Sequence, residues 1–199
     1  MKFSFSFLFC LCSLTLGFGQ QLNPEITAQQ IEINYSDTDY TLINDFKGLD
    51  FDEKNAKISF VFTEEDTSGT ISGLDFRIDF NPNDVDNAFF KGTALVETID
   101  TDNFLRDGHL MWQKFFHKKK YPKIDFQSKQ VVAFNENTFK VIGTLTIKGT
   151  SKEVIITFSL GDNKLLGNTI IHTSDFGINI HDEREKNKLE IQFHFPFLK

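Results

Sequence analysis

The chain has 199 residues, 14% of them aromatic, and a formal net charge of −7 at neutral pH. This acidic balance argues against nucleic acid as a partner, because phosphate binding needs a basic face, and against general adhesion to an anionic membrane surface. The length favours one domain with a core of its own. The 24 phenylalanines supply apolar area without polar groups, which suits either a dry core or a cavity for an apolar ligand.

Residues 1–19 have the features of a signal peptide. Lys2 is positively charged, residues 3–18 are mostly apolar, and Gly17 and Gly19 are the small residues expected at a signal-peptidase site. The apolar run is too short for a comfortable membrane span, and a retained N-terminal anchor is the alternative. We therefore expect an exported protein, periplasmic or secreted, whose mature chain has no stable membrane span. Cleavage would also remove both cysteines and leave no disulfide.

Residues 20–55 are expected to form an N-terminal extension, with a first strand at 31–35 as one interpretation. From residue 57 onward, apolar and polar side chains alternate, which is typical of strands with one face in an apolar interior and the other in water. The clearest strands are expected at 58–62, 74–80, 139–147, 154–160 and 189–195, and weaker ones at 93–99, 129–134 and 166–172. Short turns between them favour an all-β sandwich or an antiparallel barrel.

Residues 101–121 break this alternation. Phe104, Leu105 and Leu110 recur at helical intervals within this stretch. The spacing predicts one or two short helices that cover one end of the sheet.

Five motifs along the chain resemble those of the YceI family. They are 69–74 (Gly-Thr-Ile-Ser-Gly-Leu), 99–110 (Ile-Asp-Thr-Asp-Asn-Phe-Leu-Arg-Asp-Gly-His-Leu), 115–126 (Phe-Phe, then Tyr-Pro-Lys-Ile-Asp-Phe), 141–150 (Val-Ile-Gly-Thr-Leu-Thr-Ile-Lys-Gly-Thr) and 174–178 (Ser-Asp-Phe-Gly-Ile). Their order and spacing carry the resemblance. It implies an all-β, lipocalin-like antiparallel barrel of about eight strands in residues 56–199, a single domain with 20–55, capped by short helices. It also implies an exported, non-enzymatic protein that carries or stores a polyisoprenoid or fatty-acid-like lipid, without a cofactor.

The main candidate for binding such a lipid is the apolar inward face of the strands. Its members are Phe60, Phe62, Phe76, Ile78, Phe80, Phe139, Val141, Ile156, Phe158, Ile191, Phe193 and Phe195. An eight-stranded barrel is just wide enough for one slim ligand. The alternative is that these side chains fill the barrel completely, in which case the protein is structural or an interaction protein without a small ligand.

A second candidate is the polar part of the 99–110 motif, with Arg106, Asp107 and His109. These residues either contact a head group or form a structural network in which Arg106 pairs with Asp107. No serine at nucleophile-elbow spacing accompanies the histidine, so an enzyme acting on a lipid is only the third alternative. The resemblance places further lid residues beside them, namely Leu110, Phe115 and Phe116.

A basic run, His117, Lys118, Lys119 and Lys120, is a candidate for binding an anionic head group at the barrel mouth. The alternative is a solvated loop. The sequence leaves the oligomeric state open, with a homodimer among the alternatives.

A metal site is the last alternative. His172, Asp175, His181 and Asp182 lie within eleven residues, but their spacing matches no recognised ligand motif. We therefore expect no metal.

Overall fold

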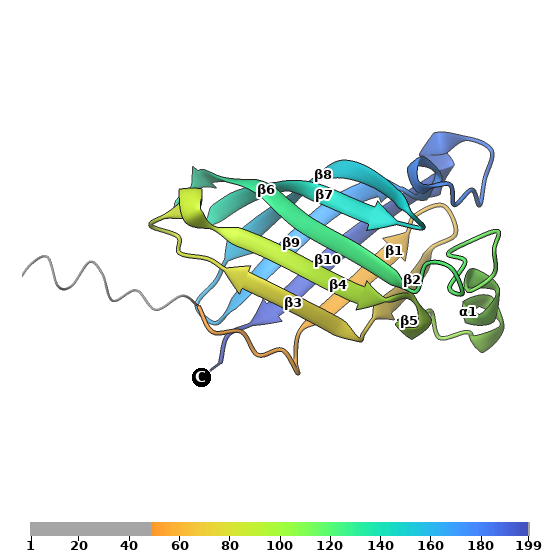
Figure 1. The fold of residues 1–199 in the computed structure, drawn as a ribbon, viewed down its shortest axis with the longest axis horizontal. Helices are drawn as coiled ribbons and strands as arrows, with labels where there is room; N and C mark the ends of the chain where they lie inside the picture. The colour runs from red at the N-terminus through yellow and green to blue at the C-terminus, as the bar shows by residue number, and fades with distance from the viewer. Residues whose placement is uncertain (1–48, 199) are drawn as a thin grey trace, which may run out of the picture. The chain divides into compact units, whose positions relative to one another are not determined.

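The computed structural model describes residues 49–198. The predicted signal peptide and the predicted strand at 31–35 lie outside the described residues. Ten strands form one antiparallel sheet (Figure 1). They are β1 (Lys57–Phe62), β2 (Thr67–Ile71), β3 (Leu74–Asp79), β4 (Phe89–Leu95), β5 (Ile99–Asp100), β6 (Lys123–Asn135), β7 (Thr138–Ile147), β8 (Thr150–Leu160), β9 (Lys164–His172) and β10 (Lys188–Pro196).

The helices of the described region are short. They are the α-helix α1 (Phe104–Leu110) and the 3-10 helices η1 (Val85–Asn87), η2 (Val96–Thr98), η3 (Thr173–Phe176) and η4 (Arg184–Asn187). The predicted all-β class with a short helix at one end is confirmed. The strand number is ten rather than about eight, because the alternation of apolar and polar residues did not indicate β2 or the two-residue β5. None of the helices within residues 49–198 is long and apolar enough to cross a bilayer.

The sheet curls into a half-barrel, with the strand order β3-β4-β6-β7-β8-β9-β10-β1-β2-β5. In Figure 1, β3, β4 and β6 pass in front of β9 and β10. Consecutive strands β2 and β3 lie in opposite arms, since β2 pairs with β1 and β3 pairs with β4. The chain turns between them at Gly73, whose φ of 64° favours glycine. The Gly73 carbonyl accepts a hydrogen bond from the Leu95 amide at 3.3 Å, which ties this corner to β4.

Alternation along the strands decides which side chains point inward. In β3, Leu74, Phe76 and Ile78 are partly buried, and the three residues that alternate with them are exposed. β9 shows the same period of two along most of its length. The inner face of the curled sheet is therefore almost entirely apolar.

The half-barrel has two unlike ends. The end formed by the β3–β4 connection and the β6–β7 hairpin is filled by a tightly packed cluster, hereafter the closed end. Its buried members are Phe80, Phe90, Val131, Phe139, Val141, Ile156, Phe158, Leu165 and Phe195. The other end, hereafter the lid end, carries α1, the loop after it and the β9–β10 connection (Figure 1). A smaller buried cluster lies there, made of Ile147, Ile171, Phe176 and Ile178.

Candidate functional site

A cavity of about 590 Å³ lies inside the half-barrel, between the inner face of the sheet and the lid end. Ligand pockets in proteins have volumes of roughly 300–1,000 Å³, so the cavity is large enough for a sizeable small molecule. Its wall is mostly aliphatic and phenyl side chains, and its few polar groups come chiefly from threonines and from residues near α1. Such a wall favours an apolar ligand with at most one polar end.

Nine of the twelve residues predicted for the inward binding face line this cavity. They are Phe60, Phe62, Phe76, Ile78, Ile156, Phe158, Ile191, Phe193 and Phe195. Several of them, including Phe60, Phe76 and Phe193, point inward and still keep part of their surface accessible. In a completely filled barrel these rings would be buried by their neighbours. The interior is therefore hollow over much of its length.

The other three predicted residues do not line the cavity. Phe80, Phe139 and Val141 are 2%, 1% and 0% exposed and belong to the closed end. The rings of Phe80 and Phe139 meet edge to face, with centroids 4.7 Å apart. Alternation predicted their inward direction, but where the cavity stops depends on how the ends of distant strands pack.

Inward-facing glycines on neighbouring strands keep several phenyl rings against the wall. A Cβ atom at Gly69 would lie 2.4 Å from Cζ of Phe60, and one at Gly143 would lie 2.5 Å from Cζ of Phe126. Such distances are too short for any side chain, so these rings occupy the space above the glycines. The rings thus lie along the sheet rather than across the interior. The sequence analysis did not identify this role for glycine, although Gly143 falls in a predicted inward position.

A hydrogen-bond network centred on Thr101 joins α1 to the barrel. The Thr101 hydroxyl, in a residue only 4% exposed, donates to Asp107 Oδ1 at 2.6 Å and accepts from Arg106 Nε at 2.8 Å. Arg106 Nη2 also donates to the Thr101 carbonyl at 2.6 Å. Arg106 and Asp107, expected to pair directly, thus meet through Thr101. Arg106 lines the cavity with all three guanidinium nitrogens engaged, because Nη1 also donates to the Thr67 hydroxyl at 3.4 Å.

The lid residues predicted from the motif reach the cavity wall as well. His109, Leu110, Phe115 and Phe116 all line it, and the His109 ring packs against Trp112 with centroids 4.4 Å apart. Among the described residues, the cavity lining contains no serine or cysteine. The wall near α1 therefore offers polar contacts for one end of a ligand.

The predicted basic run lies outside the cavity lining. Lys118 forms an ion pair with Glu97 at 2.7 Å, and Lys120 lies over the Tyr121 ring, 5.1 Å from its centroid. The His117 and Tyr121 rings meet edge to face. None of His117, Lys118, Lys119 and Lys120 lines the cavity, and their role in binding an anionic head group stays a prediction. The run belongs to the outer surface of the loop after α1.

Lys148 connects the lid loop to the barrel. Its ammonium donates to the carbonyl oxygens of Lys114 at 3.0 Å and Gly177 at 2.9 Å. Burial lowers the pKa of Lys148 below its usual range, because the charged form loses solvation there. This side chain therefore holds the loop after α1 against the η3 turn.

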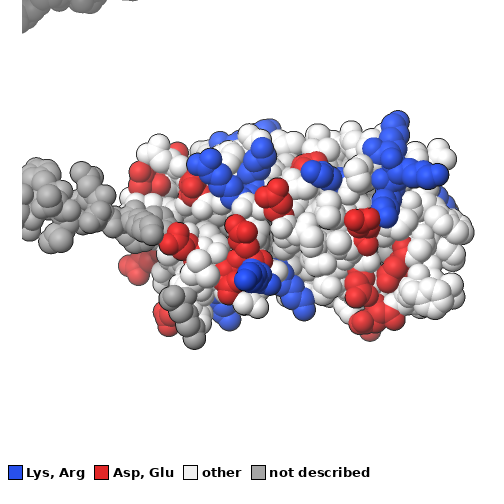
Figure 2. All heavy atoms as spheres, turned by 60° about the horizontal axis from the view of Figure 1, so that its bottom comes forward, with Lys and Arg blue, Asp and Glu red and all other residues white. Residues whose placement is uncertain are grey.

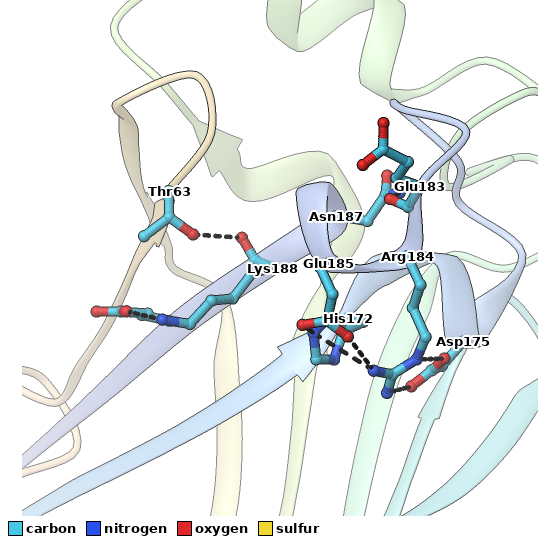
Figure 3. Close-up of polar contacts among 9 residues, drawn as sticks. Thr63, His172, Asp175, Glu183, Arg184, Glu185, Asn187 and Lys188 are labelled. Carbon is cyan, nitrogen blue, oxygen red and sulfur yellow. Dashed lines mark hydrogen bonds and ion pairs between the residues drawn. The ribbon is translucent and has the colours of Figure 1, made fainter.

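Two of the residues weighed as metal ligands, His172 and Asp175, contact charged side chains of η4 instead (Figure 3). Arg184 donates to both oxygens of Asp175, at 2.8 and 2.7 Å, and this contact holds the pKa of Asp175 below its usual range. His172 contacts Glu185 at 3.2 Å, which lowers the pKa of Glu185. His181 stacks on Phe62 with ring centroids 6.0 Å apart. Asp182 is exposed, and within the described residues no group of three potential ligands converges.

A curled antiparallel half-barrel with an apolar interior and a helical lid defines the class of lipocalin-like barrels. A family model for the YceI-like domain matches residues 49–197, and the chain belongs to this family. The UPF0312 protein SAB2563 of Staphylococcus aureus is 29% identical over 157 residues, which cover 79% of this chain and 84% of that protein.

Two solved structures show the same fold. The first is BcnA of Burkholderia cenocepacia, with a TM-score of 0.64 and 22% identity, covering 74% of this chain and 99% of BcnA. The second is a polyisoprenoid binding domain from Saccharophagus degradans that is implicated in plant cell wall breakdown. Its TM-score is 0.54 at 12% identity, and the match covers 75% of this chain and 97% of that domain. At these identities the likeness establishes the fold.

Proposed function

We propose that this protein binds a long apolar lipid in its interior cavity and carries or stores it outside the cytoplasm. The observation that carries the proposal is the hollow interior of about 590 Å³, walled by phenyl rings that remain partly accessible. Each methylene that leaves water for such a wall contributes about 0.8 kcal/mol, so a long chain binds tightly with few polar contacts. The fold shared with a polyisoprenoid binding domain supports an isoprenoid as one such lipid.

The lipid lies with its tail toward the closed end and its polar end toward α1. Near α1, Asn103, Arg106 and His109 line the cavity and supply the polar groups that a head group needs. The wall elsewhere offers mainly apolar contacts. The function proposed is binding rather than catalysis, and the fold shared with a polyisoprenoid binding domain supports it.

The test is native mass spectrometry of the exported protein purified from its own host, followed by organic extraction and identification of the lipid. We expect a stoichiometric lipid with a long hydrocarbon chain. The apo mass alone, unchanged after incubation with isoprenoid and fatty-acid mixtures, would contradict the proposal and favour a structural or interaction protein.

A matched pair of variants links the lipid to the cavity. Ile191→Trp adds a large side chain to the cavity wall and should lower the fraction of loaded protein. Ile170→Trp, on the adjacent strand β9 but pointing outward and 56% exposed, is the control and should load like the wild type. Equal loss of lipid in both variants would place the ligand outside the cavity.

A further inference from the structure

The lid end exposes large apolar side chains to solvent. Phe104, Leu105, Trp112 and Ile180 are 82%, 60%, 60% and 40% exposed, and we refer to these four residues as the lid tip. None of them belongs to either buried cluster or to the residues packed against it. Exposed apolar side chains gathered at one end of a protein indicate an interaction surface.

The lid tip adjoins the cavity. Leu105 and Ile180 both line the cavity while keeping 60% and 40% of their surface in solvent. Trp112 packs on His109, which is also part of the cavity wall. The lid tip is therefore the outer side of the same wall that a lipid would cross on entering or leaving the barrel.

The segment behind the lid tip is cationic in a protein whose net charge is −7. Residues 104–121 contain five Lys and Arg side chains and one acidic side chain, Asp107. Arg106 and Asp107 both bond to Thr101, and Lys118 pairs with Glu97. Figure 2 shows one group of blue side chains at the lid end, with red ones directly below it, and further blue side chains over the other half of the molecule. Acidic residues 64–66 form the β1–β2 turn, which also lies at this end: Glu65 lines the cavity and contacts His181, the neighbour of Ile180, at 2.9 Å.

We propose that the lid tip docks on a lipid bilayer that contains anionic head groups. This inference rests on the proposed function, because it names the surface from which the cavity takes up or releases its lipid. Apolar side chains of a short helix enter the boundary between head groups and acyl chains, and tryptophan is favoured at that depth. Lysines just behind the helix attract anionic lipids.

Docking of this kind opens a path for the ligand that avoids water. Leu105 contacts the cavity on one side and the bilayer on the other. A hydrocarbon chain that passes along α1 therefore exchanges one apolar environment for another. The basic run of residues 117–120, which does not line the cavity, acts in this arrangement on the head groups of the bilayer and not on the bound lipid.

Trp112 provides the measurement, because it is the single tryptophan of the sequence and lies in the lid tip. The exported protein, as its host processes it, is mixed with vesicles of phosphatidylcholine alone or of phosphatidylcholine with phosphatidylglycerol. We expect the Trp112 emission to shift to shorter wavelength and to be quenched by brominated acyl chains. The effect should be stronger with the anionic vesicles and weaker at high salt.

Two variants separate the apolar from the charged contribution. Phe104→Ser should lower partition into either vesicle about tenfold, since one large apolar side chain no longer leaves water. Lys119→Glu with Lys120→Glu should lower partition into anionic vesicles about tenfold or more and leave neutral vesicles little affected. Phe134→Ser is the control, because Phe134 is 67% exposed but lies near the far end of β6.

The inference is overturned if Trp112 responds to neither vesicle or if Phe104→Ser partitions like the wild type. A protein from the host that binds only when Phe104 is present, without any vesicle response, would also overturn it in favour of a protein partner. Lipid loading, measured separately without vesicles, keeps the two proposals apart. A loaded protein that ignores vesicles refutes docking alone, whereas a protein that docks but never loads refutes the proposed function.

Discussion

The closed end and the half of the barrel that holds the cavity, hereafter the cavity half, both depend on phenylalanine rings, but place most of them differently. At the closed end, rings pack on rings, as in the Phe80–Phe139 and Phe90–Phe158 pairs with centroids 4.7 and 5.2 Å apart. In the cavity half, rings lie over glycines, as Phe60 does over Gly69. Phe158, at the boundary between the two, does both: its ring stacks on Phe90 and lies over Gly167.

The largest expected difference between the closed end and the cavity half is in the unfolding free energy that an alanine substitution costs. Phe139→Ala removes a ring that is 1% exposed and should cost about 3–5 kcal/mol of unfolding free energy, because the closed end loses contacts on every side. Phe193→Ala removes a partly exposed ring of the cavity wall and should cost less than about half of that. Urea denaturation of both variants measures the difference. Equal costs would mean that the cavity half is as tightly packed as the closed end.

A methyl group added to a glycine tests whether a ring of the cavity half needs the space above that glycine. A Cβ atom at Gly167 would lie 2.5 Å from the Phe158 ring, which has the closed end on one side and the cavity on the other. Gly167→Ala should therefore push the ring into the cavity, destabilise the protein by about 1–3 kcal/mol and reduce lipid loading.

Gly92→Ala is the matched control for Gly167→Ala. Gly92 also lines the cavity, but the nearest atom to an added Cβ is Phe76 Cβ at an ordinary 3.6 Å. Stability and loading should stay close to the wild type. If Gly92→Ala behaves like Gly167→Ala, ring displacement is not the cause.

The sequence predicted the direction of side chains better than the space between them. Period-two alternation identified β3, β9 and β10, because it depends only on neighbouring residues. It missed β2, where Thr67–Ile71 contains one large apolar residue, and β5, which is two residues long. A hollow interior depends on pairs such as Phe60 and Gly69, which are brought together by strand register and not by any local pattern.

The polar residues near α1 were also predicted only in part, because their contacts depend on the fold and not on a local pattern. The motif placed Arg106 and His109 at the lid, and both line the cavity. Thr101, which joins Arg106 to Asp107, was not singled out. Its only signal is a threonine just before a predicted helix, and that position is equally typical of a cap. Helix α1 is instead capped by Asn103, whose side chain accepts from the Arg106 amide at 3.1 Å.

Lys148→Met tests whether the lid is held more weakly than the closed end. The variant leaves the Lys114 and Gly177 carbonyls without their donor and should cost about 1 kcal/mol. Amide hydrogen exchange should speed up in the loop after α1 and in η3, and stay unchanged at the closed end. Lys148→Arg keeps the charge and the donors and should restore part of the protection. Uniform acceleration over the whole barrel would show that Lys148 stabilises the fold and not the lid alone.

The smallest effect is expected from the Arg184–Asp175 pair at the lid end. The Arg184 guanidinium depresses the pKa of Asp175, so the folded state binds a proton less readily than the unfolded state. The stability from this pair is present above the unfolded pKa of Asp, about 4, and is lost as the pH falls through the depressed value. Arg184→Gln should therefore lower stability slightly at pH 6, and the difference from the wild type should shrink as the pH falls below about 4, as measured by thermal unfolding across that range. A difference that does not change with pH would mean that Arg184 acts through packing and not through its charge.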